Sequence, residues 1–122
     1  MVQLINDLYT DLDASKFAEE LRSHNDATLI DVRTPWEFAE GHIPRAENFD
    51  ISNPLFPRWI QRLSRRAPCF VYCSSGARSL TACELLVTLG FERVYNLQGG
   101  LVSWSRPLES DNEEDPAGST PV

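Results

Sequence analysis

The sequence lacks several features that mark whole classes of proteins. No apolar run approaches the ~20 residues that cross a bilayer, and no signal-peptide pattern opens the chain. Cysteines number only three, without a framework spacing, which fits a reducing compartment better than a disulfide-stapled secreted scaffold. Two separated histidines and three scattered cysteines do not form a metal-ligand pattern. We therefore expect a cytoplasmic protein without a metal, a cofactor or a membrane partner.

Basic residues are also scarce, with 11 against 18 acids and a net charge of −7. The excess lies at the C-terminus, where residues 109–122 carry five acids and no base and leave 13 acids against 11 bases elsewhere. The nearly neutral remainder neither steers nor repels small anions, and we expect no nucleic-acid partner. At 122 residues the chain is long enough for one core. We predict one domain over 1–108 and an acidic, disordered tail over 109–122.

Short apolar runs alternate with helical patterns along the chain. Asp13 is a candidate N-cap, and Thr34 with Glu37 forms a capping-box pattern around Pro35. Gly90 is placed to end a helix. The alternation predicts an α/β fold with a parallel sheet covered by helices on both faces. The expected strands are 1–5, 28–32, 46–49, 69–73 and 93–96, and the expected helices are 14–23, 35–40, 58–64 and 77–89, with a helical turn before Trp104.

The segment Cys73-Ser74-Ser75-Gly76-Ala77-Arg78 lies between an apolar strand pattern and a helical one. The first N–H groups of a helix have no intrahelical partner, and the helix dipole adds partial positive charge beside the sulfur. Such a setting favours a thiolate, and the same amides can hold an anion. Ligands of parallel sheets bind outside the carboxyl ends of the strands, where Cys73 falls. We predict an anionic, sulfur-centred active site here.

The chain contains an ordered set of motifs through which it resembles the single-domain rhodanese family of sulfurtransferases. The set covers residues 10 to 106, and it comprises Leu-Ile-Asp-Val-Arg at 29–33, Glu-Phe-Ala-Glu-Gly-His-Ile-Pro at 37–44, Val-Tyr-Cys-Ser-Ser-Gly-Ala-Arg-Ser at 71–79, Asn-Leu-Gln-Gly-Gly at 96–100, and Trp104. The resemblance implies a parallel sheet of about five strands. It also implies a cycle in which the Cys73 thiolate takes the outer sulfur of a donor and an acceptor later removes it.

The same resemblance suggests roles for the neighbours of Cys73. Backbone amides from Ser74 to Ser79 would cradle the persulfide, and Gly76 lets the backbone curl close to the sulfur. The cradle residues are Ser74, Ser75, Gly76, Ala77, Arg78 and Ser79. Arg78 would supply a fixed positive charge that closes the loop or meets the anionic group of the donor. Asp31 and Arg33 are expected to organise the loop region through hydrogen bonds or an ion pair.

Two departures from the family leave the donor open. Ser74 and Ser75 stand where thiosulfate-cleaving members often carry bases, and Glu37 stands where some members carry a cation. Thiosulfate and a small-molecule or protein persulfide are both candidate donors, and cyanide, a thiol or a protein is the candidate acceptor. The sequence does not indicate the oligomeric state. The alternative is a rhodanese-like module that binds a partner or senses redox state with little turnover.

A cysteine-based phosphatase or arsenate reductase is a further alternative. Those enzymes carry a Cys-x5-Arg motif, with five residues between the two, whereas four residues separate Cys73 from Arg78 here. The shorter loop suits one sulfur atom better than a tetrahedral oxyanion. Among the other residues, His42 is expected to brace a turn and Cys83 to be a small buried hydrophobe. Arginines at 62, 65 and 66 either complement a helix end or dock an acidic partner.

Overall fold

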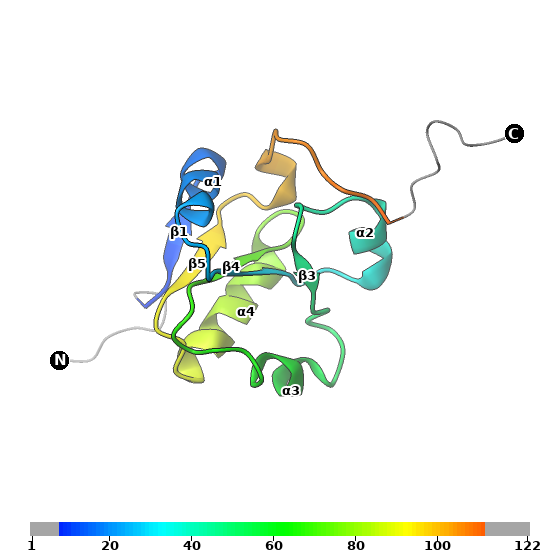
Figure 1. The fold of residues 1–122 in the computed structure, drawn as a ribbon. Helices are drawn as coiled ribbons and strands as arrows, with labels where there is room; N and C mark the ends of the chain where they lie inside the picture. Colours follow the sequence, from blue (N-terminus) through cyan, green and yellow to red (C-terminus); the bar gives the residue numbers. More distant parts are fainter. Residues whose placement is uncertain (1–7, 112–122) are drawn as a thin grey trace, which may run out of the picture.

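The computed structural model describes residues 8–111, and its centre is a five-stranded sheet in the order β1-β5-β4-β2-β3 (Figure 1). Every neighbouring pair is parallel. The strands are β1 (Thr10–Leu12), β2 (Thr28–Asp31), β3 (Glu47–Asn48), β4 (Cys69–Tyr72) and β5 (Val94–Leu97). The α/β class with a parallel five-stranded sheet is confirmed. The strand predicted at 1–5 lies outside the described residues, and the edge strand β1 was not predicted from the sequence.

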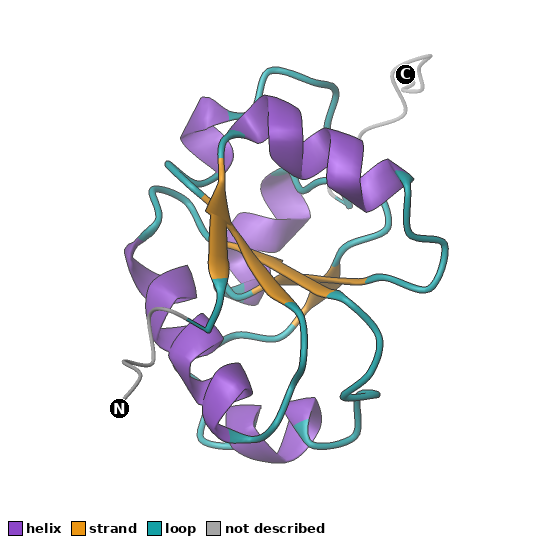
Figure 2. Cartoon of the chain, turned by 90° about the vertical axis from the view of Figure 1, so that its left-hand side faces the viewer, coloured by secondary structure: helices purple, strands orange, loops and turns teal. Residues whose placement is uncertain are grey.

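Helices cover both faces of this sheet, as Figure 2 shows from the side. They are α1 (Ala14–Arg22), α2 (Pro35–Glu40), α3 (Phe56–Ile60), α4 (Ala77–Thr88) and the 3-10 turn η2 (Leu101–Ser103). One core cluster joins α3 and α4 to the sheet, and a second joins α1 and the η2 region to its other face. None of the helices described between residues 8 and 111 has the length and apolarity needed to cross a membrane.

The predicted helix caps are present. The Asp13 carboxylate accepts a hydrogen bond from the Lys16 amide at 2.8 Å, and Thr34 and Glu37 form the complete capping box. The end of α4 differs slightly from the prediction, because Leu89 is the cap and Gly90 follows it with φ 93°. Gly90 and Phe91 then donate to carbonyls of the last turn at 3.0 Å each, which closes the helix as a Schellman motif.

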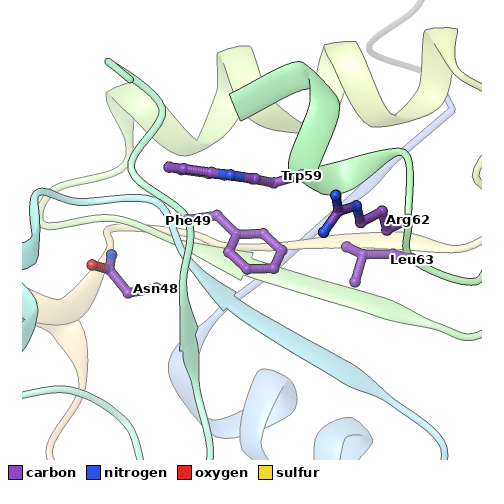
Figure 3. A pocket seen from close by; sticks show the side chains of 5 residues that line it. All are labelled: Asn48, Phe49, Trp59, Arg62 and Leu63. Carbon is purple, nitrogen blue, oxygen red and sulfur yellow. The ribbon is translucent and has the colours of Figure 1, made fainter. Parts of the chain in front are cut away.

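Helix α3 begins two residues before the predicted start at Arg58 and ends four before the predicted end at Ser64. Phe56 and Ile60 are one turn apart and both buried, so burial sets the bounds of the helix. The arginines predicted near its end therefore lie in the following loop. The Arg65 guanidinium donates to the Leu89 carbonyl at 2.8 Å and so complements the end of α4. Arg62 lines a shallow hollow with the rings of Phe49 and Trp59 (Figure 3).

Candidate active site

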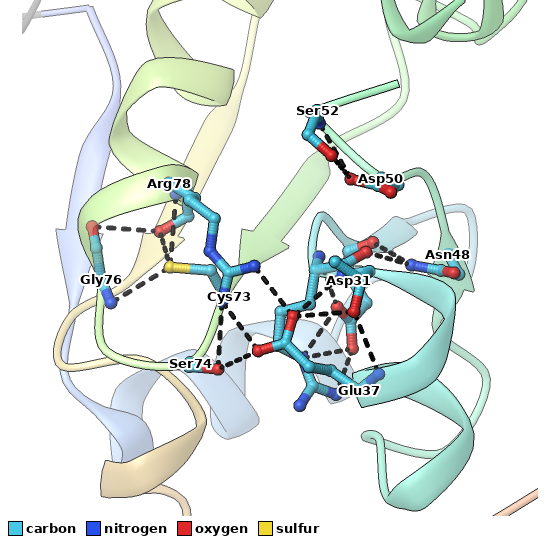
Figure 4. A network of polar contacts seen from close by, with 12 residues as sticks. Asp31, Glu37, Asn48, Asp50, Ser52, Cys73, Ser74, Gly76 and Arg78 are labelled. Carbon is cyan, nitrogen blue, oxygen red and sulfur yellow. Dashed lines mark hydrogen bonds and ion pairs between the residues drawn. The ribbon is translucent and has the colours of Figure 1, made fainter.

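Cys73 directly follows β4, which lies between β2 and β5 at the middle of the sheet. Cys73 is buried, with 1% of its surface exposed. The sulfur accepts hydrogen bonds from the backbone N–H groups of Gly76 at 3.1 Å and Ser79 at 3.3 Å, and it lies 3.3 Å from the Ser79 hydroxyl (Figure 4). These donors come from the start of α4, where amides have no intrahelical partner. The arrangement can hold negative charge on this sulfur without a metal.

Local backbone geometry lets the loop curl around the sulfur. Gly76 has φ 111°, a left-handed conformation that favours glycine, and it is the N-cap residue of α4. Of the six residues predicted as a cradle, Gly76 and Ser79 direct amides at the sulfur. Ser74 and Arg78 contribute side chains to the wall of the site instead, while Ser75 and Ala77 line a hollow next to the loop.

The turn at 99–103 supports the loop that follows β4. The amides of Leu101 and Val102 donate to the carbonyls of Cys73 and Ser74 at 2.8 and 3.0 Å. Gly100, with φ 68°, approaches so closely that a Cβ atom there would overlap the Ser74 carbonyl. The sequence contained a signal for this contact in its adjacent glycines. Motif reasoning assigned them no role, because only the fold brings the two loops together.

Arg78 is bound by Glu37 from α2. Two parallel hydrogen bonds of 2.9 and 3.0 Å join the guanidinium to the carboxylate, and the Ser74 hydroxyl lies 3.3 Å from both partners. The hydrogen bond from Arg78 is the main cause that lowers the pKa of Glu37 to about 2, and Thr34 assists. Arg78 therefore closes the loop against α2, with its charge neutralised. The sequence prediction did not include Glu37 among the site residues.

Asp31 and Arg33 form a buried ion pair at the end of β2. The Arg33 Nη2 atom lies 2.6 Å from the Asp31 carboxylate and also donates to the Gly41 carbonyl at 2.7 Å. The Asn48 side chain donates to the carbonyls of both Asp31 and Arg33. The pair thus fixes the turn after α2 to the sheet. Arg33 and Ser74 of the loop after β4 also line the same small hollow.

His42 braces the turn after α2, as predicted. Its ring stacks on Phe38 at 3.7 Å, and Nδ1 donates to the Phe38 carbonyl at 2.7 Å. Backbone hydrogen bonds of 2.8 Å in both directions pair His42 with Glu109. Of the tail predicted at 109–122, residues 109–111 are described and lie along this turn, and the others are outside the described residues.

The three thiols have different surroundings. All are free and buried in the described structure. Burial raises the pKa of Cys69 to about 12 and also raises that of Cys83. Among residues 8–111, neither thiol receives paired amide donors like those that reach Cys73, which makes Cys73 the candidate nucleophile. Within residues 8–111, no group of three or more His, Cys, Asp or Glu side chains could hold a metal ion.

This geometry agrees with comparisons with known proteins. The family described as "Rhodanese-like domain" matches residues 13–107, which is most of the chain. The chain belongs to the rhodanese-like domain family. Among curated members, a sulfurtransferase of Allochromatium vinosum is 35% identical over 99 residues, 81% of this chain and 91% of that protein. The thiosulfate sulfurtransferase GlpE of Stutzerimonas stutzeri is 37% identical over 89 residues, 73% of this chain and 80% of that protein.

Solved structures of rhodanese-like proteins share the fold. A rhodanese-related protein from Thermoplasma volcanium superposes with a TM-score of 0.70 at 33% identity and covers 83% of this chain and 98% of its own. A rhodanese-like domain protein from Staphylococcus aureus has a TM-score of 0.73 at 25% identity, with 83% and 97% covered. The rhodanese-like resemblance predicted from the motifs is confirmed.

Proposed function

We propose that this rhodanese-like protein is a sulfurtransferase that carries sulfane sulfur as a persulfide on Cys73. The observation that carries the proposal is the pair of amides, from Gly76 and Ser79, that donate to the Cys73 sulfur at the start of α4. A persulfide is a polarisable anion, and fixed amide dipoles stabilise such charge. The sulfurtransferase names of the 35% and 37% identical relatives support the same reaction.

The reaction has two displacements at sulfur. First, the Cys73 thiolate attacks the outer sulfur of a donor such as thiosulfate, the donor S–S bond breaks, and sulfite leaves with the bonding pair. Second, an acceptor nucleophile such as cyanide or a thiolate attacks the outer sulfur of the persulfide, and Cys73 leaves as thiolate. This is covalent catalysis, which divides one transfer into two easier steps. The chain's own contribution is to hold the charged sulfur with amides.

The ion pair of Arg78 weighs against the phosphatase alternative. A phosphate in a Cys-x5-Arg loop is held by N–H donors and positive charge of the arginine, whereas the Arg78 guanidinium already gives two N–H donors to Glu37 at 2.9 and 3.0 Å, and its charge is compensated. The same pair reduces the positive charge offered to thiosulfate, a dianion. We therefore propose thiosulfate as one donor and a low-molecular-weight or protein persulfide as another.

Intact-protein mass spectrometry tests the proposal. The chain is incubated with thiosulfate or a persulfide donor, and Cys73 is expected to gain the mass of one sulfur atom that cyanide then removes as thiocyanate. Cys73→Ser should gain nothing, and Cys83→Ala should behave as the unaltered chain because Cys83 is buried in α4. If no donor adds sulfur to Cys73, the proposal is wrong and the chain is a binding or sensing module.

A further inference from the structure

In Figure 4, Gly76 lies on the opposite side of Cys73 from Glu37. The hollow lined by Ser75 and Ala77 borders the loop on this side. The hollow has a volume of about 340 Å³. Asp11 of β1 and Asn96 of β5 form one wall, and residues 75–77 of the loop form another. It is distinct from the Glu37–Arg78 pair and from the buried ion pair of Asp31, and the proposed persulfide cycle assigns it no role.

Asn96 is a buried side chain with an unused acceptor. Its residue is 2% exposed, and its amide nitrogen donates to the Asp11 carboxylate at 2.8 Å. A carboxylate only accepts hydrogen bonds, so this contact fixes which end of the amide is nitrogen. The carbonyl oxygen Oδ1 is buried and accepts a hydrogen bond from none of the described residues. A buried polar atom of this kind calls for a donor from a ligand or a water.

Asp11 adds negative charge to the same wall. It is exposed, and no ion pair of the residues from 8 to 111 involves it. The Asp11 and Asn96 side chains therefore both line one hollow, and none of its lining residues is a cation. An ammonium group carries a positive charge and three N–H donors, which suit a wall that holds a carboxylate beside an amide with an unpaired oxygen. Anionic donors such as thiosulfate are repelled by the same charge.

The hollow is close to the reacting sulfur. Gly76 lines it and donates its amide proton to the Cys73 sulfur at 3.1 Å. Asn96 is the register partner of Val71, and Cys73 follows two residues later on the same face of the sheet. Strand geometry places the two Cα atoms about 7 Å apart along the strands and about 5 Å across them. Gly76 is therefore a boundary that the hollow shares with the amide donors of the sulfur.

We propose that this hollow binds the ammonium group of a small aminothiol, which serves as the acceptor of sulfur from Cys73. This inference rests on the proposed function. The aminothiol thiolate attacks the outer sulfur of the Cys73 persulfide in its protonated form, Cys–S–SH. A new S–S bond forms, the old one breaks, and Cys73 leaves as thiolate while the aminothiol departs as its persulfide. The sulfur moves without an external oxidant or reductant, and Asp11 and Asn96 act as binding residues.

Acceptor specificity tests the inference. The second-order rate constant kcat/KM is measured with thiosulfate as donor and with cysteamine or uncharged 2-mercaptoethanol as acceptor. Asp11→Asn is expected to lower the cysteamine to 2-mercaptoethanol ratio about fivefold, the size expected for a partly exposed charge pair. Asp26→Asn removes the same charge from an exposed residue in the loop before β2, three strands away from β1, and should leave the ratio unchanged. Comparing ratios between variants cancels the different intrinsic reactivities of the thiols.

A titration that needs no turnover separates the two proposals. Ethanolamine has the ammonium group and no thiol, and it should shift the NMR signals of the Asn96 side-chain amide in the unaltered chain but not in Asp11→Asn. An unchanged acceptor ratio together with no ethanolamine shift means that only water fills the hollow, which overturns the inference. If sulfur never reaches Cys73, the proposed function fails, and an ethanolamine shift would still show an ammonium site.

Discussion

At the scale of single residues, the bond between Glu37 and Arg78 sets the charge of the mouth of the site. The two side chains come from α2 and the start of α4, and their parallel hydrogen bonds hold both in place. Arginine is always charged at neutral pH, so its field near Cys73 depends on whether Glu37 is ionised. We therefore expect Glu37 to control both loop closure and the attraction of anions.

Replacing Glu37 by glutamine should strengthen the binding of thiosulfate. The substitution keeps the shape of the side chain but leaves the Arg78 charge uncompensated, so the KM for thiosulfate should fall about twofold to fivefold at low salt. High salt should reduce the difference by screening. Steady-state kinetics measure this, with Glu40→Gln on the exposed end of the same helix as the control. An unchanged KM would mean that the donor does not meet Arg78.

The same carboxylate predicts a pH dependence of stability. The pKa of Glu37 is lowered to about 2 in the folded protein from its ordinary value of 4.5, mainly by the hydrogen bond from Arg78. A lowered folded-state pKa stabilises the fold above the unfolded-state value, and this contribution is lost as the pH falls from about 4.5 to about 2. The free energy of unfolding should thus decline more steeply over this range in the unaltered chain than in Glu37→Gln. If the free energy of unfolding declines equally in the two proteins over this pH range, Glu37 is not the group responsible.

At the scale of elements, the turn at 99–103 and the loop after β4 act as one unit. Their backbones are joined by two hydrogen bonds to the carbonyls of Cys73 and Ser74, and Gly100 permits the close approach. Support of this kind limits how far the amides of the loop can move away from the sulfur. The two loops follow β4 and β5, which are neighbouring parallel strands, so the sheet order brings them together at the site.

Gly100→Ala should separate these two loops. The new Cβ atom would overlap backbone atoms of Ser74 and Ser75, and alanine is strained at φ 68°. We expect a loss of about 1–3 kcal/mol in the free energy of unfolding and a larger loss of sulfur transfer to Cys73. Urea denaturation and persulfide mass spectrometry measure the two effects. Gly41→Ala is the control, because φ there is 169° and the nearest atom belongs to the flexible Leu108 side chain.

At the scale of the whole molecule, the C-terminal segment attaches beyond the region shared with the family. The family match ends at residue 107, whereas Glu109 pairs with His42 and the Asp111 amide donates to the Ala39 carbonyl at 2.9 Å. These contacts hold the segment against the turn after α2. They add to the domain from outside its core.

Truncation after Leu108 should therefore leave a folded domain of lower stability. The loss of the two backbone hydrogen bonds between His42 and Glu109 and of the one from Asp111 to Ala39 predicts a decrease of about 1–3 kcal/mol in the free energy of unfolding. Truncation after Asp111 keeps these contacts and should leave a more stable chain than truncation after Leu108. Thermal and urea unfolding of the three proteins would measure this. If the chain truncated after Leu108 fails to fold, the domain extends beyond the predicted boundary at 108.

Local patterns in the sequence were sufficient for many parts of the fold. Caps at Asp13 and Thr34, the short apolar strands and the loop before α4 depend on residues within one turn or strand of each other, so the sequence alone indicates them. Helix α3 was misplaced by this reasoning because its bounds depend on the burial of Phe56 and Ile60 against distant strands. Local propensity does not contain that information.

The sequence by itself determined the family, the α/β class and the candidate nucleophile, because the motif around Cys73 is contiguous in the chain. Only the tertiary structure decided the partners of that motif. Glu37 is 41 residues from Arg78, and Asn96 is 85 residues from Asp11. Parallel strands bring such distant residues to one edge of the sheet, and the resulting pairs decide where charge is neutralised and where it remains free. Those charges, rather than the nucleophile, set the choice of donor and acceptor that we propose.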